Sequence, residues 1–135
     1  MAWNTQKIAG SVISVLVAVF LVFSGSGKVF FNLPPKERID TVGYKVDTWR
    51  KVGVVEMLTG IVYIVPQTTF IGAILVTAQL GGAMATHVRI GEPPFGPFLI
   101  GILAWIGYAL RRPDVICAAL KRRRKPATLG PPSTV

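Results

Sequence analysis

The chain has 135 residues, of which 51% are hydrophobic and 16% are charged, and its net charge is +9 at pH 7. A soluble domain usually carries charge on about one residue in four, so this composition argues against a soluble globular protein. The charges fall into three islands, residues 28–51, 89–92 and 111–125, and the stretches between them are nearly uncharged. A bilayer imposes this segregation, because it excludes charge from its apolar slab and admits it at both faces.

The high isoelectric point, near 10.3, is also found in proteins that bind nucleic acids. Here the basic residues flank apolar segments instead of forming one patch, so we expect no nucleic-acid partner and expect contact with the lipid bilayer. Cys117 is the single cysteine, so no intrachain disulfide can form. No Cys/His spacing typical of a metal site occurs, and we expect no metal.

The first predicted span is the uncharged run from Ile8 to Gly27. About twenty apolar residues cross the hydrocarbon core as a helix, since each residue adds 1.5 Å. A cleaved signal peptide is the alternative, because Lys7 precedes the run and small residues close it. We favour a retained helix, because the run is longer than a usual signal-peptide core and further hydrophobic segments follow it.

A polar connection follows, and Leu33-Pro34-Pro35 breaks the helix, because the residue before a proline avoids the α region. The second predicted span, residues 49–65, contains Glu56. The uncharged part of this span is short. The span reaches an adequate length only if Arg50 and Lys51 extend their side chains to the interface. Pro66 ends this span, and the short uncharged link that follows predicts an antiparallel hairpin with the third.

The third predicted span, residues 70–87, is rich in small residues, and such residues at four-residue spacing let helix backbones approach closely in lipid. A neighbouring face carries a polar strip of Gln79, Ala83 and His87. The predicted helix-packing face comprises Ala78, Gly81, Gly82 and Ala85.

The fourth predicted span, residues 94–110, begins with prolines, which the first turn of a helix tolerates. The sequence therefore predicts an all-α fold: a bundle of four transmembrane helices within residues 1–113. Residues 114–125 are predicted to lie on the membrane surface, and residues 126–135 to be disordered. The basic residues expected at lipid headgroups are Arg111, Arg112, Lys121, Arg122, Arg123, Arg124 and Lys125.

Four spans place both termini on the same side of the membrane. The numbers of basic residues on the two sides nearly balance. The cluster near the C-terminus has only Asp114 as an acidic neighbour, whereas the first loop mixes in three acidic residues. By the positive-inside rule we place both termini in the cytoplasm.

This topology brings polar residues from all four spans to one membrane face. Glu56 should lie deepest there, and a carboxylate at that depth is costly unless it is paired, hydrated or protonated. Lys28, Arg50, His87 and Arg89 are its candidate partners. The predicted polar pocket comprises Lys28, Arg50, Glu56, Gln79, His87 and Arg89.

Two interpretations of this pocket stay open. In one, it binds a headgroup, a quinone ring or a peptide, or relays protons through Glu56 and His87. In the other, Glu56 belongs to a structural ion pair that fixes the register of the helices. A single histidine supplies one axial ligand per chain, so we expect no haem, and we assign no catalytic residues.

Five sequence features in this order resemble the DoxX-like family of small four-helix membrane proteins, over roughly residues 8–113. They are Ser24-Gly25-Ser26-Gly27-Lys28, Gly53-Val54-Val55-Glu56, Phe70-Ile71-Gly72-Ala73-Ile74-Leu75, Gly81-Gly82-Ala83 with Thr86-His87 and Arg89, and Trp105 before Arg111-Arg112-Pro113. The resemblance implies a location in the cytoplasmic membrane of a bacterium. Some members of the family are associated with quinol oxidase, thiosulfate–quinone oxidoreductase or oxidative-stress complexes.

We therefore expect a non-catalytic accessory or structural subunit of a membrane redox complex, with other membrane proteins as partners. The first alternative is a stand-alone protein that binds a quinone or a lipid in the polar pocket. A transporter or proton channel is the weakest alternative, because no inverted repeat is visible.

Overall fold

The computed structural model describes residues 2–31 and 35–121, and within these ranges the chain is helical and contains no strand. The all-α prediction is confirmed. The predicted helix break at residues 33–34, the basic residues 122–125 and the tail 126–135 lie outside the described residues. The helices are α1 (Ala2–Phe30), α2 (Lys36–Val42), α3 (Val46–Ile64), α4 (Thr69–Arg89), α5 (Phe95–Arg111) and α6 (Pro113–Leu120).

The long helices continue beyond the apolar runs that predict them. α1 starts before Ile8, and α4 extends to Arg89 instead of His87. Hydropathy marks only the apolar part of a helix, whereas backbone hydrogen bonding continues into the polar flanks. Two of the described helices are long and apolar enough to cross a membrane, Asn4–Phe30 and Thr69–Arg89, and α5 is a shorter apolar helix.

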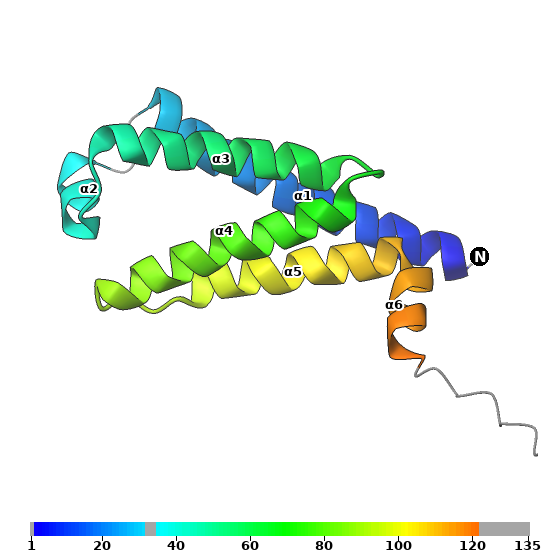
Figure 1. Ribbon diagram of the computed structural model, residues 1–135. Helices are drawn as coiled ribbons and strands as arrows, with labels where there is room; N and C mark the ends of the chain where they lie inside the picture. The colour runs from blue at the N-terminus through cyan, green and yellow to red at the C-terminus, as the bar shows by residue number, and fades with distance from the viewer. Residues whose placement is uncertain (1, 32–34, 122–135) are drawn as a thin grey trace, which may run out of the picture.

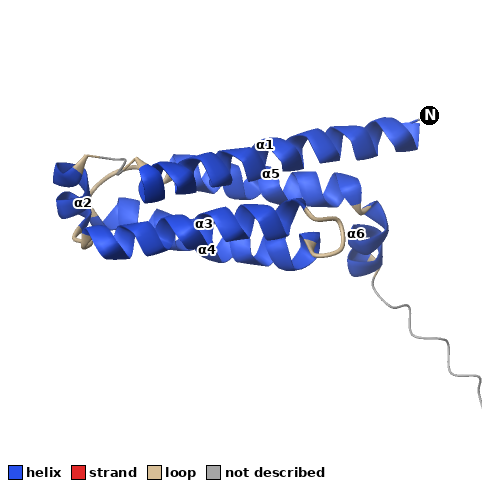
Figure 2. Ribbon diagram, turned by 90° about the horizontal axis from the view of Figure 1, so that it is seen from above, coloured by secondary structure: helices blue, strands red, loops and turns tan. Residues whose placement is uncertain are grey.

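The four long helices pack in a ring, in which α1 contacts α3 and α5, and α4 contacts the same two helices (Figure 2). α6 turns away from the end of α5, at the same end of the bundle as the start of α1 (Figure 1). One buried residue from each helix marks the centre of the core: Leu21, Tyr63, Val76 and Ala104. Two hydroxyl groups lie within this core, since the Tyr63 hydroxyl donates to the carbonyl of Ala104 (2.7 Å) and lies 3.2 Å from Ser14 Oγ.

Glycines permit the closest contacts between the helices. A Cβ atom built on Gly25 would lie 2.5 Å from the carbonyl oxygen of Gly53, so α1 and α3 touch backbone to backbone. Gly72 of α4 lies directly against the backbone of Tyr63 on α3, and Gly107 of α5 lies against Ser14 of α1. Small residues let helices approach in this way in lipid, and here they join each helix to a neighbour in the ring.

The face of α4 that we predicted to pack against other helices is exposed within the chain. Ala78, Gly81, Gly82 and Ala85 are all exposed, and a Cβ atom on either glycine would meet no atom within 4 Å. The face of α4 that packs inward instead carries Gly72, Ala73, Val76 and Leu80. Spacing identified a face of small residues, but the position of the larger apolar side chains decided which face turns inward.

The two helix pairs diverge toward one end of the bundle. The α1–α3 pair and the α4–α5 pair lie close together near the α3–α4 turn and separate toward α2 (Figure 1). The buried residues of α4 extend from Thr69 to Leu80 and no further along this helix. α2 lies across the diverging end, and Gly43 terminates it in the left-handed conformation (φ 77°), which glycine adopts readily.

Candidate functional site

A cavity of about 380 Å³ lies at the diverging end of the bundle, lined by residues of α1, α2, α3 and α4 and by Tyr44. Of the six residues of the predicted polar pocket, the cavity brings together Lys28, Glu56, Gln79 and His87. Arg50 is exposed on α3 and does not line the cavity. Arg89 does not line the cavity either, but its side chain contacts Val42 and Tyr44, which do.

Glu56 is paired with Lys28, one of its four candidate partners. Lys28 Nζ donates a hydrogen bond to Glu56 Oε2, and a second one to Ser24 Oγ at 3.0 Å. The two side chains are 15% and 8% exposed. The Lys28 ammonium also lies 5.6 Å from the centroid of the Trp49 ring, whose face attracts a cation. A charged side chain inside the bundle is therefore neutralised by its partner, which lowers the cost of burying both.

Two contacts hold α2 over the end of the cavity. Arg38 of α2 donates to Glu92 Oε2 at 2.6 Å, which joins α2 to the α4–α5 connection. Arg89 donates from Nη2 to the carbonyl of Val42, and its guanidinium lies 5.8 Å from the ring centroid of Tyr44. The hydrogen bond from the Arg38 guanidinium holds the pKa of the Glu92 carboxyl below its usual value of 4.5.

Two polar side chains at the cavity have unused hydrogen-bonding capacity. His87 Nδ1 is buried without a hydrogen-bond partner among the described residues. The half-buried amide of Gln79 makes no side-chain hydrogen bond within residues 2–31 and 35–121. Buried polar atoms in proteins are nearly always satisfied, so an unsatisfied one calls for an explanation. Some polar groups that line the cavity therefore remain able to hydrogen-bond to a ligand.

Each charged side chain that lines the cavity is paired with a side chain of opposite charge. Lys28 pairs with Glu56, and Arg38 pairs with Glu92. Within the described part of the chain, each cationic lysine or arginine of the lining therefore has an acidic partner. A neutral ligand with hydrogen-bonding groups fits such a lining better than an anion, which would need an unpaired cation.

Arg38, Tyr44 and Trp49 also line the cavity and were not part of the predicted pocket. The Trp49 ring lies beside the Lys28 ammonium and 5.9 Å from the Tyr44 ring. The sequence signal for these residues was their place in the chain, since Arg38 and Tyr44 lie between the first two long helices and Trp49 lies in the first turn of the second. The position of the residues in the chain did not predict that α2 folds Arg38 back over the bundle.

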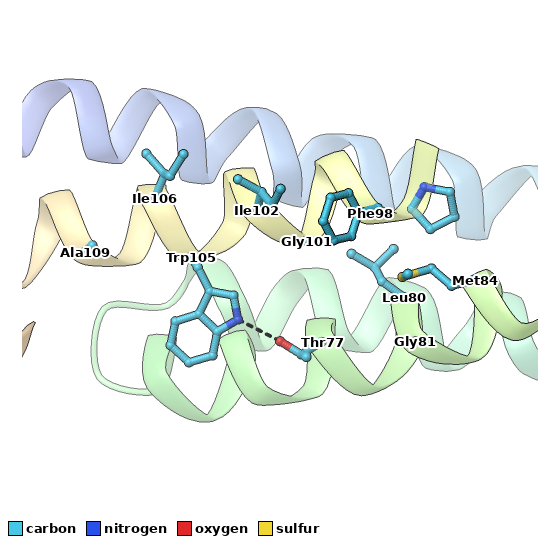
Figure 3. Close-up of a pocket in the computed structure, with 11 residues that line it drawn as sticks. Thr77, Leu80, Gly81, Met84, Phe98, Gly101, Ile102, Trp105, Ile106 and Ala109 are labelled. Atoms are coloured by element: carbon cyan, nitrogen blue, oxygen red, sulfur yellow. Dashed lines mark hydrogen bonds between the residues drawn. The ribbon is translucent and has the colours of Figure 1, made fainter. Parts of the chain in front are cut away.

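An apolar groove runs along the outer side of α4 and α5, with a volume of about 600 Å³ (Figure 3). Trp105 of α5 points across to α4 and donates from Nε1 to Thr77 Oγ1 at 2.9 Å (Figure 3). Leu80, which is 6% exposed, lines both this groove and the cavity. Leu80 is thus common to the two linings.

Arg111, Arg112 and Lys121, three of the seven basic residues that we expect at lipid headgroups, lie at the other end of the bundle from the cavity. Arg111 donates to the carbonyl of Ile64 at 3.5 Å, and Arg112 pairs with Asp114 at 3.5 Å. Lys121 is exposed. The remaining members of this group, residues 122–125, lie outside the described residues, so their contact with lipid stays a prediction.

Four long helices pack in a ring around a paired lysine and glutamate, and two of them are long and apolar enough to cross a membrane. A family model described as the DoxX-like family matches residues 12–109. The chain belongs to the DoxX-like family, and the resemblance noted from its sequence is confirmed. Neither the curated proteins nor the solved structures include a significant match to the chain.

Proposed function

We propose that this chain is a four-span protein of the bacterial cytoplasmic membrane that binds the head of a membrane-soluble molecule, a quinone by class, in the cavity beneath α2. The observation that carries this proposal is the buried, unsatisfied Nδ1 of His87 beside the half-buried Gln79 amide, in a cavity whose charged side chains are all paired. A ligand that accepts and donates hydrogen bonds without a net charge would complete this site.

The proposed spans are α1, α3, α4 and α5, with both termini in the cytoplasm. α3 carries four charged residues, and their positions reconcile it with a membrane. Asp47, Arg50 and Lys51 lie in its first two turns, near the interface. Glu56 is the charge that lies deeper, and Lys28 neutralises it. The pair therefore supports a spanning role for a helix whose composition alone is too polar.

The size and the lining of the cavity favour a single-ring head. Ligand sites have volumes of roughly 300–1,000 Å³, and about 380 Å³ lies at the small end of that range. Trp49 and Tyr44 supply aromatic surfaces on which a flat ring can stack. Quinone carbonyls accept hydrogen bonds, and the Gln79 amide can donate them. A lipid phosphate would meet no unpaired lysine or arginine among the described lining residues.

The test measures binding of 2,3-dimethoxy-5-methyl-1,4-benzoquinone to the purified protein in mild detergent, by quenching of tryptophan fluorescence and by the shift in melting temperature. Gln79→Leu removes the amide at similar size and leaves the Lys28–Glu56 pair intact. We expect it to weaken binding about tenfold, as the loss of a buried hydrogen bond does.

Gln67→Leu is the matched control, because Gln67 is exposed in the α3–α4 turn at the other end of the bundle. This variant should bind like the wild type. Equal affinities of the wild type and Gln79→Leu, or the absence of any binding, would overturn the proposed function.

A second candidate function is an accessory subunit of a membrane redox complex, and the groove between α4 and α5 favours it. The groove is apolar, exposed and large enough to receive side chains of another helix. Gly101→Leu would fill it, since a Cβ there meets only Leu80 Cδ1 at 3.7 Å.

The experiment for this candidate isolates the protein under mild conditions from cells of its source and identifies co-purifying proteins. Gly96→Leu is the control, because Gly96 lies on the same helix, in open space and outside the groove. A partner lost with Gly101→Leu and kept with Gly96→Leu supports the subunit role. Isolation without any partner contradicts it.

A further inference from the structure

The cavity beneath α2 reaches the outer surface of the bundle at α4. Its lining includes Leu80, which is 6% exposed and belongs to the core. It also includes Ala78 and Gly82, which are exposed on the outside of the same helix. The cavity therefore extends from the core, around the side of α4, to the exterior of the chain.

This opening lies on one side of α4 only. Thr77, Gly81 and Met84 face the groove shared with α5, and no residue of α5 lines the cavity. Ala78 and Gly82 are four residues apart and so share a face. A Cβ atom on Gly82 would meet no atom within 4 Å. The opening therefore lies on the side of α4 away from α5, where small residues leave space.

The opening is placed to face lipid in the proposed membrane orientation. Gly82 precedes Arg89, the last residue of α4, by seven residues, which corresponds to about 10 Å along the helix axis. The route toward water is different, because α2 covers the end of the cavity and is tied down by Arg38–Glu92 and by Arg89 to Val42. The cavity is thus covered toward water and open toward the hydrocarbon region.

We infer that the ligand carries an apolar chain, which leaves the cavity sideways over Ala78 and Gly82 into the lipid while the polar head stays near Gln79 and His87. This inference rests on the proposed function and specifies the ligand class as a long-chain quinone. A small residue at position 82 leaves room for a chain beside the helix backbone. The exposed small residues of α4 then serve ligand passage instead of packing within the bundle.

The test compares two probes, 2,3-dimethoxy-5-methyl-1,4-benzoquinone and its 6-decyl derivative, with the protein in lipid nanodiscs. The variants are Gly82→Leu, which places a side chain in the opening, and Gly81→Leu as the matched control. A Cβ at Gly81 also meets nothing within 4 Å, but Gly81 lines the groove toward α5 instead of the cavity. Leucine favours helix more than glycine does, so both variants are expected to fold.

We expect Gly82→Leu to raise the Kd of the decyl probe about tenfold and to leave the Kd of the headgroup probe unchanged. Gly81→Leu should alter neither. Unchanged binding of both probes to Gly82→Leu would overturn the lateral exit and leave the proposed function standing. An equal loss of binding of both probes would do the same, because it would place the substitution in the head site. Failure of both probes to bind the wild type would overturn the proposed function itself.

Discussion

Lys28 and Glu56 meet because each side chain leans back toward the N-terminus of its own helix. α1 and α3 run antiparallel, and their backbones touch at Gly25 and Gly53. Lys28 and Glu56 each lie three residues beyond that contact, on opposite sides of it. Helical side chains tilt toward the N-terminal end, so the two lean toward each other over the glycines. The absent Cβ of Gly53 also makes room for the Lys28 stem, which would lie 2.8 Å from it.

Glu56→Ala should destabilise the protein by about 3 kcal/mol, because removing one partner leaves the Lys28 ammonium buried without its counter-charge. Unfolding in mixed micelles with increasing sodium dodecyl sulfate measures the change. Asp47→Ala is the control, since the Asp47–Lys51 pair is 76% and 75% exposed, and its loss should be undetectable. If the two variants are equally stable, the buried pair contributes no more than a surface pair.

Gly53→Ala should destabilise the bundle by about 1–3 kcal/mol through overpacking. The added methyl group would lie 2.7 Å from the carbonyl oxygen of Gly25, so one of the backbones has to move. The same unfolding assay applies. Gly81→Ala is the comparison, because its methyl group meets open space, and alanine favours helix by about 1 kcal/mol over glycine. We therefore expect opposite signs for the two changes; equal signs would contradict the backbone contact.

Tyr63→Phe should cost about 1–2 kcal/mol, because it removes the buried hydroxyl that donates to Ala104 and lies next to Ser14. A double-mutant cycle with Ser14→Ala in the same assay separates the hydroxyl pair from the bond to the carbonyl. We expect the two substitutions to be non-additive, since they share a partner. Strict additivity would show that the Ser14–Tyr63 contact contributes nothing.

The Arg38–Glu92 pair makes the attachment of α2 dependent on pH. Because the pKa of Glu92 is lower in the folded protein than its usual 4.5, the pair stabilises the attachment fully above that value. The contribution is lost as pH falls through the lowered pKa. Hydrogen exchange of the α2 amides, expressed as the ratio of wild type to Glu92→Gln at each pH, measures it. We expect slower exchange in the wild type at pH 6, and a ratio that approaches one as the pH falls through the lowered pKa of Glu92.

Equal exchange in the two proteins at every pH would show that the ion pair does not hold α2. Arg38→Gln provides an independent check, since it removes the other partner and should give the exchange of Glu92→Gln. Asp47→Asn is the control for altered charge alone, because Asp47 pairs with Lys51 on α3 and makes no contact with Glu92.

The apolar runs of the sequence predicted the all-α fold and the approximate positions of the long helices, because hydropathy reports where a helix is apolar. Hydropathy could not predict which face of α4 packs into the core. Its small residues and its larger residues, such as Val76 and Leu80, lie on different faces, and the larger residues form the core. Small-residue spacing alone does not distinguish a face that packs from a face that stays open.

The candidate site was partly predictable for a related reason. Antiparallel topology alone brings Lys28, Glu56 and His87 to the same end of the bundle, and the structure places all three at one cavity. The choice of Lys28 as the partner of Glu56 depends on the Gly25–Gly53 contact. The part played by Arg38 depends on α2 folding back over the bundle, and no hydropathy pattern reports that path.

Leu80 offers a physical link between the two spaces that it lines. It lines both the cavity and the α4–α5 groove, so a rotation of its side chain toward one space would leave more room in the other. A molecule that prefers one rotamer in the cavity therefore changes the shape offered to a helix in the groove. By thermodynamic reciprocity, the helix changes the affinity of the cavity by the same factor. Binding of the head group in the cavity and binding of a partner helix in the groove would then depend on the same equilibrium between Leu80 rotamers.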